Sequence, residues 1–186
     1  MARSSVQSEI RQSRPFRSKK QEATIALLRT ASVVGRTLGR VLEPWGLSLA
    51  QYNALRIIRG AGAEGIATLA IRERMIEEGT TITRILDKLE QSAYIRRERA
   101  LPDRRQVICE ITAEGRRLLD KIDPAVDAAD EDAVAALTSR QVVQLIELLD
   151  TVRAANAERG APRTMVRAPD SRHANAISLR GAKNSG

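Results

Sequence analysis

A change of hydrophobic period near residue 94 constrains the fold of this chain more than any other feature. Within residues 80–92, apolar side chains recur three and four positions apart, which is one face of an α-helix. Within residues 94–111 they alternate instead, as in a half-buried strand, and Leu101-Pro102-Asp103 is typical of a turn. The sequence therefore predicts an amphipathic helix followed by a small two-stranded hairpin.

Helical spacing also precedes this segment. Residues 20–43 present one apolar face, and Pro44 ends the pattern. Ser48 and Gln51 then match a capping box, in which the serine oxygen accepts from a free backbone amide and the glutamine reaches back. A second helix is therefore expected from Ser48 to about Gly60.

Three more helices complete the prediction. A short one is expected over 67–75, another after Thr112, and a last one after the capping box at Thr138-Ser139-Arg140-Gln141. In the short helix, Thr68 is the expected cap, and Leu69 and Met75 are the expected inward residues.

The order of helices and hairpin predicts a mostly α fold with a small β-hairpin wing, a winged helix-turn-helix. The first and last helices carry apolar faces larger than so small a module needs, which favours pairing with a second copy of the chain. The residues expected at this homodimer interface are Leu27, Val34, Leu38, Leu118, Ile122, Val142, Leu145, Ile146 and Leu149.

The net charge of +8 comes from the ends of the chain. Residues 1–20 hold six basic side chains and one acidic one, and residues 153–186 hold seven and two. Both ends lack apolar periodicity, so 1–20 and 156–186 are expected to be disordered basic tails around a domain at 21–155. An argument for nucleic-acid binding must therefore rest on local charge within the domain.

Several function classes are disfavoured. The chain has one cysteine, Cys109, and one histidine, His173, too few for a structural zinc site or an internal disulfide. No apolar run is long enough to span a membrane, and no signal peptide is recognisable. The chain also lacks a Ser-His-Asp set and a glycine-rich phosphate loop. We therefore expect a protein of the cytoplasm, associated with the nucleoid, that is not an enzyme and has no cofactor.

Over about 21–155 the chain resembles the MarR family of winged helix-turn-helix regulators. The family pattern places T-R and L-x-x-L-E on the recognition helix, a hydrophobic residue and two arginines at the start of the wing, D-x-R at its tip, and L-T-x-x-G at the next helix. The matching segments here are Thr83-Arg84, Leu86-Asp87-Lys88-Leu89-Glu90, Ile95-Arg96-Arg97, Asp103-Arg104-Arg105 and Ile111-Thr112-Ala113-Glu114-Gly115. Two departures are Ser92-Ala93, where the family often has glycine, and Glu77-Glu78, where it is often basic.

The resemblance implies a DNA-binding lobe at about 48–111, with a helix in the major groove and a wing against the DNA. Arg105 would enter the minor groove with Asp103 as its orienter; the alternative is a turn-stabilising pair. The residues expected to contact DNA are Thr80, Thr81, Thr83, Arg84, Lys88, Arg96, Arg97, Arg104 and Arg105. The alternative for the helix residues is a solvated face.

The family mechanism implies a homodimeric repressor on a pseudo-palindromic operator of double-stranded DNA, with recognition helices about 10 bp apart. A small-molecule effector, often aromatic or acidic in the family, would bind between the dimer helices and the lobe and release the DNA. Two alternatives stay open: a winged-helix module that binds another protein, and an architectural protein that coats DNA through its tails without sequence preference.

Four further features have a functional and a structural interpretation. Cys109 is interpreted as a core residue rather than a redox switch, because it alternates with Val107 and Ile111. Trp45 and Tyr52 line a ligand pocket or belong to the core. The acidic stretch 123–132 lacks the glycine and spacing of a calcium loop, which favours a solvated connection over a metal site. His173 has no companion ligand and is expected to be exposed in the tail.

Overall fold

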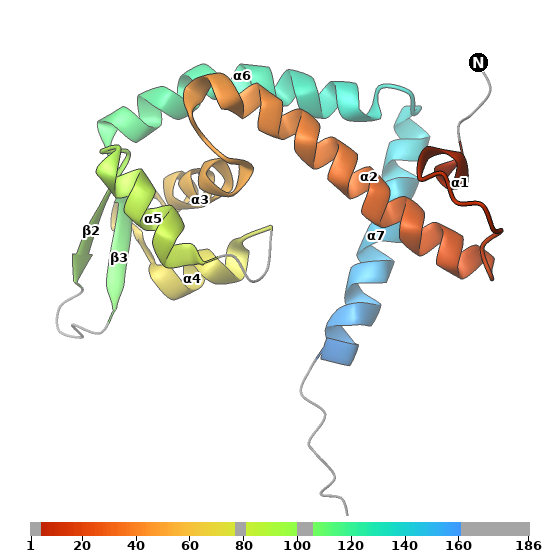
Figure 1. The fold of residues 1–186 in the computed structure, drawn as a ribbon. Coiled ribbons are helices and arrows are strands. Elements are labelled where there is room, and N and C mark those ends of the chain that lie inside the picture. Colours follow the sequence, from red (N-terminus) through yellow and green to blue (C-terminus); the bar gives the residue numbers. More distant parts are fainter. Residues whose placement is uncertain (1–4, 77–80, 100–105, 161–186) are drawn as a thin grey trace, which may run out of the picture. The chain divides into compact units, whose positions relative to one another are not determined.

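The computed structural model describes residues 5–76, 81–99 and 106–160. Two compact units are present, one ending at Ala136 and the other beginning at Leu137. The long first and last helices of the sequence prediction, and the two strands of the wing, are present (Figure 1). The helices of the first unit are α1 (Val6–Glu9), α2 (Lys19–Leu42), α3 (Leu49–Gly60), α4 (Thr68–Arg74), α5 (Ile82–Gln91) and α6 (Ala113–Val134), and the second unit contains α7 (Ser139–Gly160).

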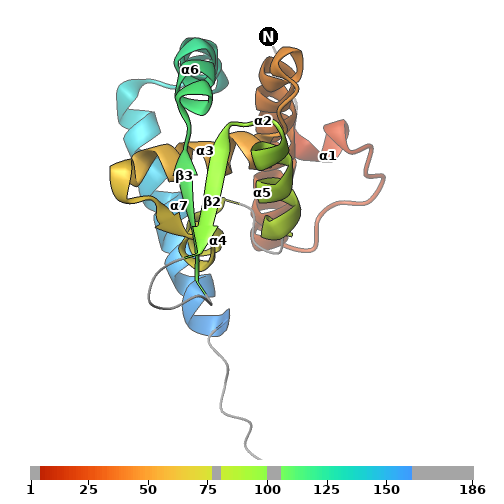
Figure 2. The same ribbon diagram turned by 90° about the vertical axis from the view of Figure 1, so that its left-hand side faces the viewer.

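The sheet has three strands rather than the two predicted. Strands β2 (Ile95–Arg99) and β3 (Val107–Ile111) form the expected antiparallel hairpin, and β1 (Ile66–Ala67) pairs antiparallel with the other edge of β3. Cys109 therefore lies between Ile66 and Arg97 in the register of the sheet. Figure 2 shows β2 and β3 side by side with α5 next to them. The mostly helical winged fold is thus confirmed, with one strand added.

One hydrophobic core holds the first unit together. It joins the end of α2 to α3, α4, α5, the sheet and α6, so the helix that precedes the wing and the helix that follows it share the same packing. Burying such side chains is the main favourable term in folding. The largest fully buried side chains are Leu42, Leu55, Ile58, Ile71, Leu86, Leu89, Leu119, Ile122 and Cys109.

Three of the predicted helix starts are confirmed by their hydrogen bonds. Ser48 Oγ accepts from the Gln51 amide at 3.2 Å, and Gln51 Oε1 accepts from the Ser48 amide at 2.9 Å, which completes the capping box. Thr112 Oγ1 accepts from the Gly115 amide at 3.0 Å. Thr138 and Gln141 bond in the same reciprocal way at the start of α7.

The start of α4 was predicted wrongly. Ala67 occupies the cap position, and the Thr68 hydroxyl donates instead to the carbonyl of Val107 at 3.2 Å. Leu69, expected to face the core, is 56% exposed, whereas Met75 is buried as expected. Pairing of β1 with β3 brings Thr68 close to the wing strand, so its hydroxyl finds a partner outside its own helix.

One segment that was expected to be a disordered tail is partly helical, and the acidic stretch that was expected to be a solvated helix connection lies inside a helix. Residues 6–9 form the one-turn helix α1, capped by Ser5, and Glu9 lies 3.5 Å from Arg29 on α2. The acidic stretch 123–132 lies within α6, which continues through Pro124. Residues 161–186, including His173, lie outside the described residues. Over the described residues, no helix is both long and apolar enough to cross a membrane.

The residues predicted at a dimer interface fall into two groups. Ile122 is fully buried in the core of the single chain, and Leu38 and Leu118 pack against that core. Leu27 on α2 is 37% exposed, and Val34 is partly buried. On α7, Leu145 and Ile146 are exposed, and Val142 and Leu149 are partly exposed. Burial of Ile122 therefore needs no partner, while the α7 residues leave an apolar surface uncovered within their own unit.

Candidate nucleic-acid interface

Helix α5 separates apolar and polar residues cleanly. Ile85, Leu86 and Leu89 are buried in the core, as predicted. The other side of the helix is exposed, and Arg84 and Lys88 make no ion pair with the residues that the structure describes. Free cations on an exposed helix face suit phosphate oxygens or guanine edges. The predicted contact residues that lie on this exposed side are Thr81, Thr83, Arg84 and Lys88.

Arg84 and Lys88 also border a groove that the sequence did not predict. The groove has a volume of about 270 Å³ and lies between the start of α3 and the exposed side of α5. Ser48 and Gln51, the capping-box pair, line it on the α3 side. The groove therefore combines two cationic side chains with the positive end of a helix dipole.

Arg97, on β2, bonds to the recognition helix rather than pointing freely to solvent. Its guanidinium lies 2.5 Å from Glu90 Oε2 and 2.7 Å from Asp87 Oδ1, both on α5. The hydrogen bond from Arg97 to Glu90 raises the pKa of the guanidinium, against an opposing contribution from partial burial. These bonds join the base of the wing to the last two turns of α5, so Arg97 fixes the geometry of the two elements.

Arg96 is also paired within the sheet. It donates to Glu110 Oε2 on β3 at 2.7 and 3.2 Å, and it lies 3.8 Å from Glu98. The bond to Glu110 raises the pKa of Arg96. Its side chain is 61% exposed, so it stays accessible to a phosphate despite these partners.

Three of the predicted contact residues, together with the predicted orienter Asp103, fall outside the part of the chain that the structure describes. Thr80 at the start of the recognition helix and Asp103, Arg104 and Arg105 at the wing tip lie outside the described residues. The two strands that carry the wing tip are in register from Ile95↔Ile111 to Arg99↔Val107. The predicted roles of these four residues remain predictions.

The end of α5 explains one departure from the family pattern. Ala93 has φ +58°, in the left-handed region. The Tyr94 amide donates to the Leu89 carbonyl at 2.9 Å, and the Ala93 amide donates to the Glu90 carbonyl at 2.8 Å. These two bonds form a Schellman motif, which normally uses glycine at the left-handed position. The chain thus keeps the glycine conformation with an alanine.

Gly115 shows why the next motif needs its glycine. A Cβ atom added there would lie 2.2 Å from the Tyr94 carbonyl oxygen and 2.9 Å from Cγ1 of Ile111. The Tyr94 carbonyl also accepts from the Thr112 amide at 3.0 Å. Close contact between the start of α6 and the start of the wing therefore excludes a side chain at this position.

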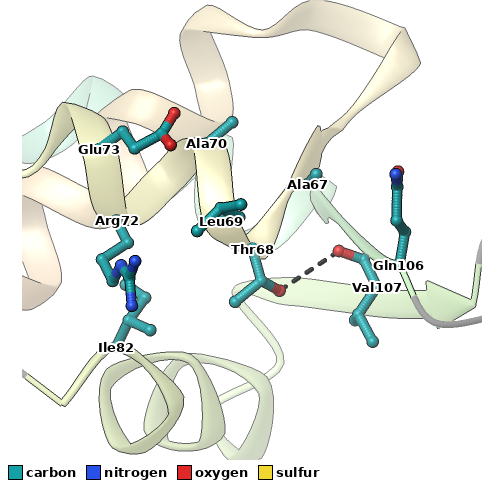
Figure 3. Close-up of a pocket in the computed structure, with 9 residues that line it drawn as sticks. All are labelled: Ala67, Thr68, Leu69, Ala70, Arg72, Glu73, Ile82, Gln106 and Val107. Atoms are coloured by element: carbon teal, nitrogen blue, oxygen red, sulfur yellow. Dashed lines mark hydrogen bonds between the residues drawn. The ribbon is translucent and has the colours of Figure 1, made fainter.

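A pocket of about 550 Å³ lies beside α5, between α4 and the wing strand (Figure 3). Thr68, Leu69 and Arg72 come from α4, Ile82 begins α5, and Val107 begins β3. The dashed line in Figure 3 marks the Thr68–Val107 hydrogen bond at its edge. The pocket is bounded by the elements that set the recognition helix against the wing.

Tyr52 has a structural role. It is buried, and its hydroxyl donates to Asp123 Oδ1 at 2.9 Å. Burial, with the hydrogen bond to Asp123, raises the pKa of Tyr52 to about 12. Trp45 is 36% exposed, so it does not belong to the buried core. The ligand pocket expected at Trp45 and Tyr52 stays a prediction.

Cys109 is fully buried, and its Sγ lies 3.8 Å from the Thr68 hydroxyl. Burial raises the pKa of the thiol above its ordinary value. This environment agrees with the interpretation of Cys109 as a core residue. Within the described part of the chain, no group of three or more histidine, cysteine, aspartate or glutamate side chains is placed to hold a metal ion.

A second pocket of about 550 Å³ lies where α2 leads into α3. Arg36 and Arg40, one helical turn apart on α2, line it together with Glu43, Leu47 and Ser48. The Arg36 guanidinium donates to the Ser32 hydroxyl at 2.6 Å. The pocket thus combines two arginines and one glutamate with the edge of the buried Leu47, between the long helix and the start of α3.

Comparison with known proteins gives a consistent result. A family model described as transcriptional regulator SarA/Rot matches residues 37–122. The HTH-type transcriptional regulator TtmR of Methylorubrum extorquens is 32% identical over 121 residues, which cover 65% of this chain and 60% of TtmR.

Solved structures agree. A MarR transcription factor from Planctomyces limnophilus is 31% identical, with a TM-score of 0.58, and the match covers 74% of this chain and 99% of that one. CouR from Rhodococcus jostii, solved with p-coumaroyl-CoA, is 26% identical, with a TM-score of 0.63, and the match covers 74% of this chain and 95% of CouR. The Planctomyces limnophilus protein, like TtmR, is a regulator of transcription.

Proposed function

This chain belongs to the MarR family of DNA-binding transcriptional regulators, and from that premise we propose that it is a repressor that binds a pseudo-palindromic operator as a homodimer. One observation carries the proposal: α5 buries Ile85, Leu86 and Leu89 and leaves Thr81, Thr83, Arg84 and Lys88 exposed. A helix of this kind fits the major groove, where such side chains bond base edges and phosphates. A dimer bound across a promoter blocks it sterically.

Exposed apolar side chains support the dimer. On α2, Leu28 is 62% exposed and Val33 is 40% exposed. On α7, Ile146 is 53% exposed and Leu148 is 66% exposed. Water contact with so many large apolar residues on two long helices is unfavourable, so burial against a second copy is the natural outcome.

The pocket between α2 and α3 supports control by an acidic small molecule. Arg36 and Arg40 supply positive charge, and Leu47 supplies an apolar contact. CouR, at 26% identity, was solved with p-coumaroyl-CoA, an aromatic thioester that carries phosphates. An anion bound between the long helix and the lobe favours one lobe position over another, which is how a ligand shifts DNA affinity.

The test is a fluorescence-anisotropy titration with the full chain and with a chain shortened to residues 21–155, which lacks both basic tails. The probe is the DNA beside the protein's own gene, and the competitor is a scrambled duplex of the same composition. We expect both proteins to prefer the native duplex by about a hundredfold, or about 2.7 kcal/mol. Loss of all binding on shortening, without sequence preference in the full chain, would favour a tail-driven architectural protein.

Matched substitutions locate the binding face. Arg84→Ala and Lys88→Ala each remove one charge from α5, and Lys121→Ala removes one from an exposed position on α6. We expect the α5 variants to weaken binding by about tenfold, since a good base or phosphate contact contributes roughly 1–3 kcal/mol. Equal behaviour of all three variants, with no preference for the native duplex, would instead favour a module that binds another protein.

A further inference from the structure

We propose that Asp123 is a positioning residue, which holds α6 against α3 at Pro124 and so sets the distance between the two recognition helices of the dimer. The cluster consists of Tyr52 and Arg59 on α3 and Asp120 and Asp123 on α6, and is called the Asp123 cluster below. This inference rests on the proposed dimeric, DNA-binding function and adds to it a determinant of operator spacing.

Both carboxylate oxygens of Asp123 are engaged by α3. The Tyr52 hydroxyl donates to Oδ1 at 2.9 Å, and the Arg59 guanidinium lies 2.7 Å from Oδ2. Arg59 also lies 3.7 Å from Asp120, one turn earlier on α6. Tyr52 is only 4% exposed and the Asp123 side chain 25%, so water competes weakly for these bonds.

The cluster lies where the backbone of α6 is weakest. Pro124 is inside the helix and has no amide hydrogen, so the carbonyl of Asp120 loses its usual helical partner. Asp120 is thus the residue whose backbone carbonyl lacks a helical partner, and Asp123 is the residue directly before the proline. Side-chain bonds from α3 reach α6 at the turn that its own backbone holds least well.

The turn of α6 at Pro124 lies between the helix α2 and the elements that carry the recognition helix. The first residues of α6 follow directly from the wing strand β3, and α6 packs along α2 (Figure 1). On the other side of the cluster, α3 packs against the recognition helix α5 and against β3. A change of angle at Pro124 therefore moves the DNA-binding lobe relative to α2, and in a dimer the separation of the two α5 helices changes with it.

The first test measures that separation without DNA. Spin labels are placed at Lys88→Cys on α5 in a full-length Cys109→Ala background, and double electron–electron resonance gives the distance distribution in the dimer. We expect one narrow distribution in the parent and a broader or shifted one in Asp123→Ala. Asp127→Ala, which removes an exposed carboxylate one turn further along α6, is the matched control and is expected to leave the distribution unchanged.

A second variant tests the hinge itself. Pro124→Ala restores the missing amide, so Asp123→Ala combined with Pro124→Ala is expected to return the distribution towards the parent. Tyr52→Phe removes only one bond of the Asp123 cluster and keeps the ring in the core, so it reports on the cluster if Asp123→Ala fails to fold. An unchanged distribution in both Asp123→Ala and Tyr52→Phe would overturn the proposal.

The functional readout is spacing preference, which a merely structural residue would not alter. Affinity is measured for the native operator and for operators with one or two base pairs inserted between the half-sites. We expect Asp123→Ala to reduce the preference for native spacing by about tenfold, since hydrogen bonds to a charged group contribute at least that much to an equilibrium. The inference is wrong if the parent binds its operator selectively but the ratio of affinities for native and lengthened operators is the same in Asp123→Ala as in Asp127→Ala. If the parent itself does not prefer its operator, the proposed function fails instead.

Discussion

The guanidinium of Arg97, on the first wing strand, donates to Oε2 of Glu90, on the last turn of the recognition helix, at 2.5 and 2.9 Å. Asp87, one turn earlier, lies 2.7 Å from the same guanidinium. The Arg97 side chain is 23% exposed, so these bonds are only partly screened by water. The orientation of the wing therefore depends on the recognition helix that it accompanies onto DNA.

Arg97→Met tests that dependence. Methionine keeps the aliphatic packing of the side chain and removes the bonds to Glu90 and Asp87. We expect the free energy of unfolding to fall by about 1 kcal/mol, a value reduced from that of a fully buried pair because both acids are partly exposed. Specific DNA affinity is expected to fall as well, because the wing is no longer aligned with α5.

Chemical denaturation and anisotropy titration measure these two effects of Arg97→Met. Arg99→Met, on the exposed end of the same strand, is the control for loss of charge. If Arg97→Met binds the native duplex as tightly as the parent does at the same salt concentration, residues other than Arg97 align the wing with the helix.

Ala93→Gly is expected to stabilise the protein. Ala93 has φ +58°, a conformation that costs an L-residue roughly 1–2 kcal/mol and costs glycine nothing. Part of this gain is offset by the greater freedom of glycine in the unfolded chain, so we expect a net gain of about 0.5–1 kcal/mol.

Gly46→Ala provides the reverse measurement for Ala93→Gly. Gly46 has φ +66°, and a Cβ atom there would meet nothing within 4 Å, so only the backbone conformation opposes the substitution. The change is expected to destabilise by about 1 kcal/mol. Thermal unfolding measures the change in stability of both variants. A change in the same direction for Ala93→Gly and Gly46→Ala would contradict the argument from backbone conformation.

Gly115→Ala is expected to destabilise the fold through a steric clash. The new methyl group would lie 2.2 Å from the Tyr94 carbonyl oxygen, which is backbone and has little room to move. Overpacking of this kind typically costs about 1–3 kcal/mol. Gly39→Ala, in α2 with open space around the added Cβ atom, is the control and is expected to stabilise by roughly 0.5–1 kcal/mol. A stable Gly115→Ala protein would mean that α6 can shift away from the wing.

The sequence predicted those elements whose signal is local. Helix α5 and the strand of Val107, Cys109 and Ile111 each extend over several periods, so apolar spacing alone identifies them. The capping box of Ser48 and Gln51 lies within four residues and is found where it was expected. By contrast, β1 has only two residues, which is too short for any period to be visible.

The missed features depend on contacts between residues far apart in the chain. The hydroxyl of Thr68 was expected to cap its own helix, but the pairing of β1 with β3 brings it to the carbonyl of Val107, 39 positions away. Tyr52 and Asp123 are 71 positions apart, so nothing in the acidic stretch marks one aspartate as the partner of a buried phenol. Arg97 was expected to contact DNA because its charge is visible in the sequence, and that contact stays a prediction; its bonds to Glu90 and Asp87 depend on the direction of the side chain, which the sequence does not show.

The thiol of Cys109 is expected to be unreactive in the folded protein. Its pKa is raised by burial and lowered in part by the bond to Thr68, with a net rise, and thiolate rather than thiol is the reactive form. Native protein at pH 8 is therefore expected to resist both iodoacetamide and peroxide, while urea-unfolded protein reacts fully. Because the thiol ionises more readily in the unfolded chain, its ionisation lowers the stability of the native state as pH rises above about 9, whereas at neutral pH the thiol is protonated in both states and does not alter stability. Mass spectrometry of the alkylated chain gives the result, and rapid modification of the native protein, or release of bound DNA by peroxide that Cys109→Ser abolishes, would show that the thiol acts as a redox switch.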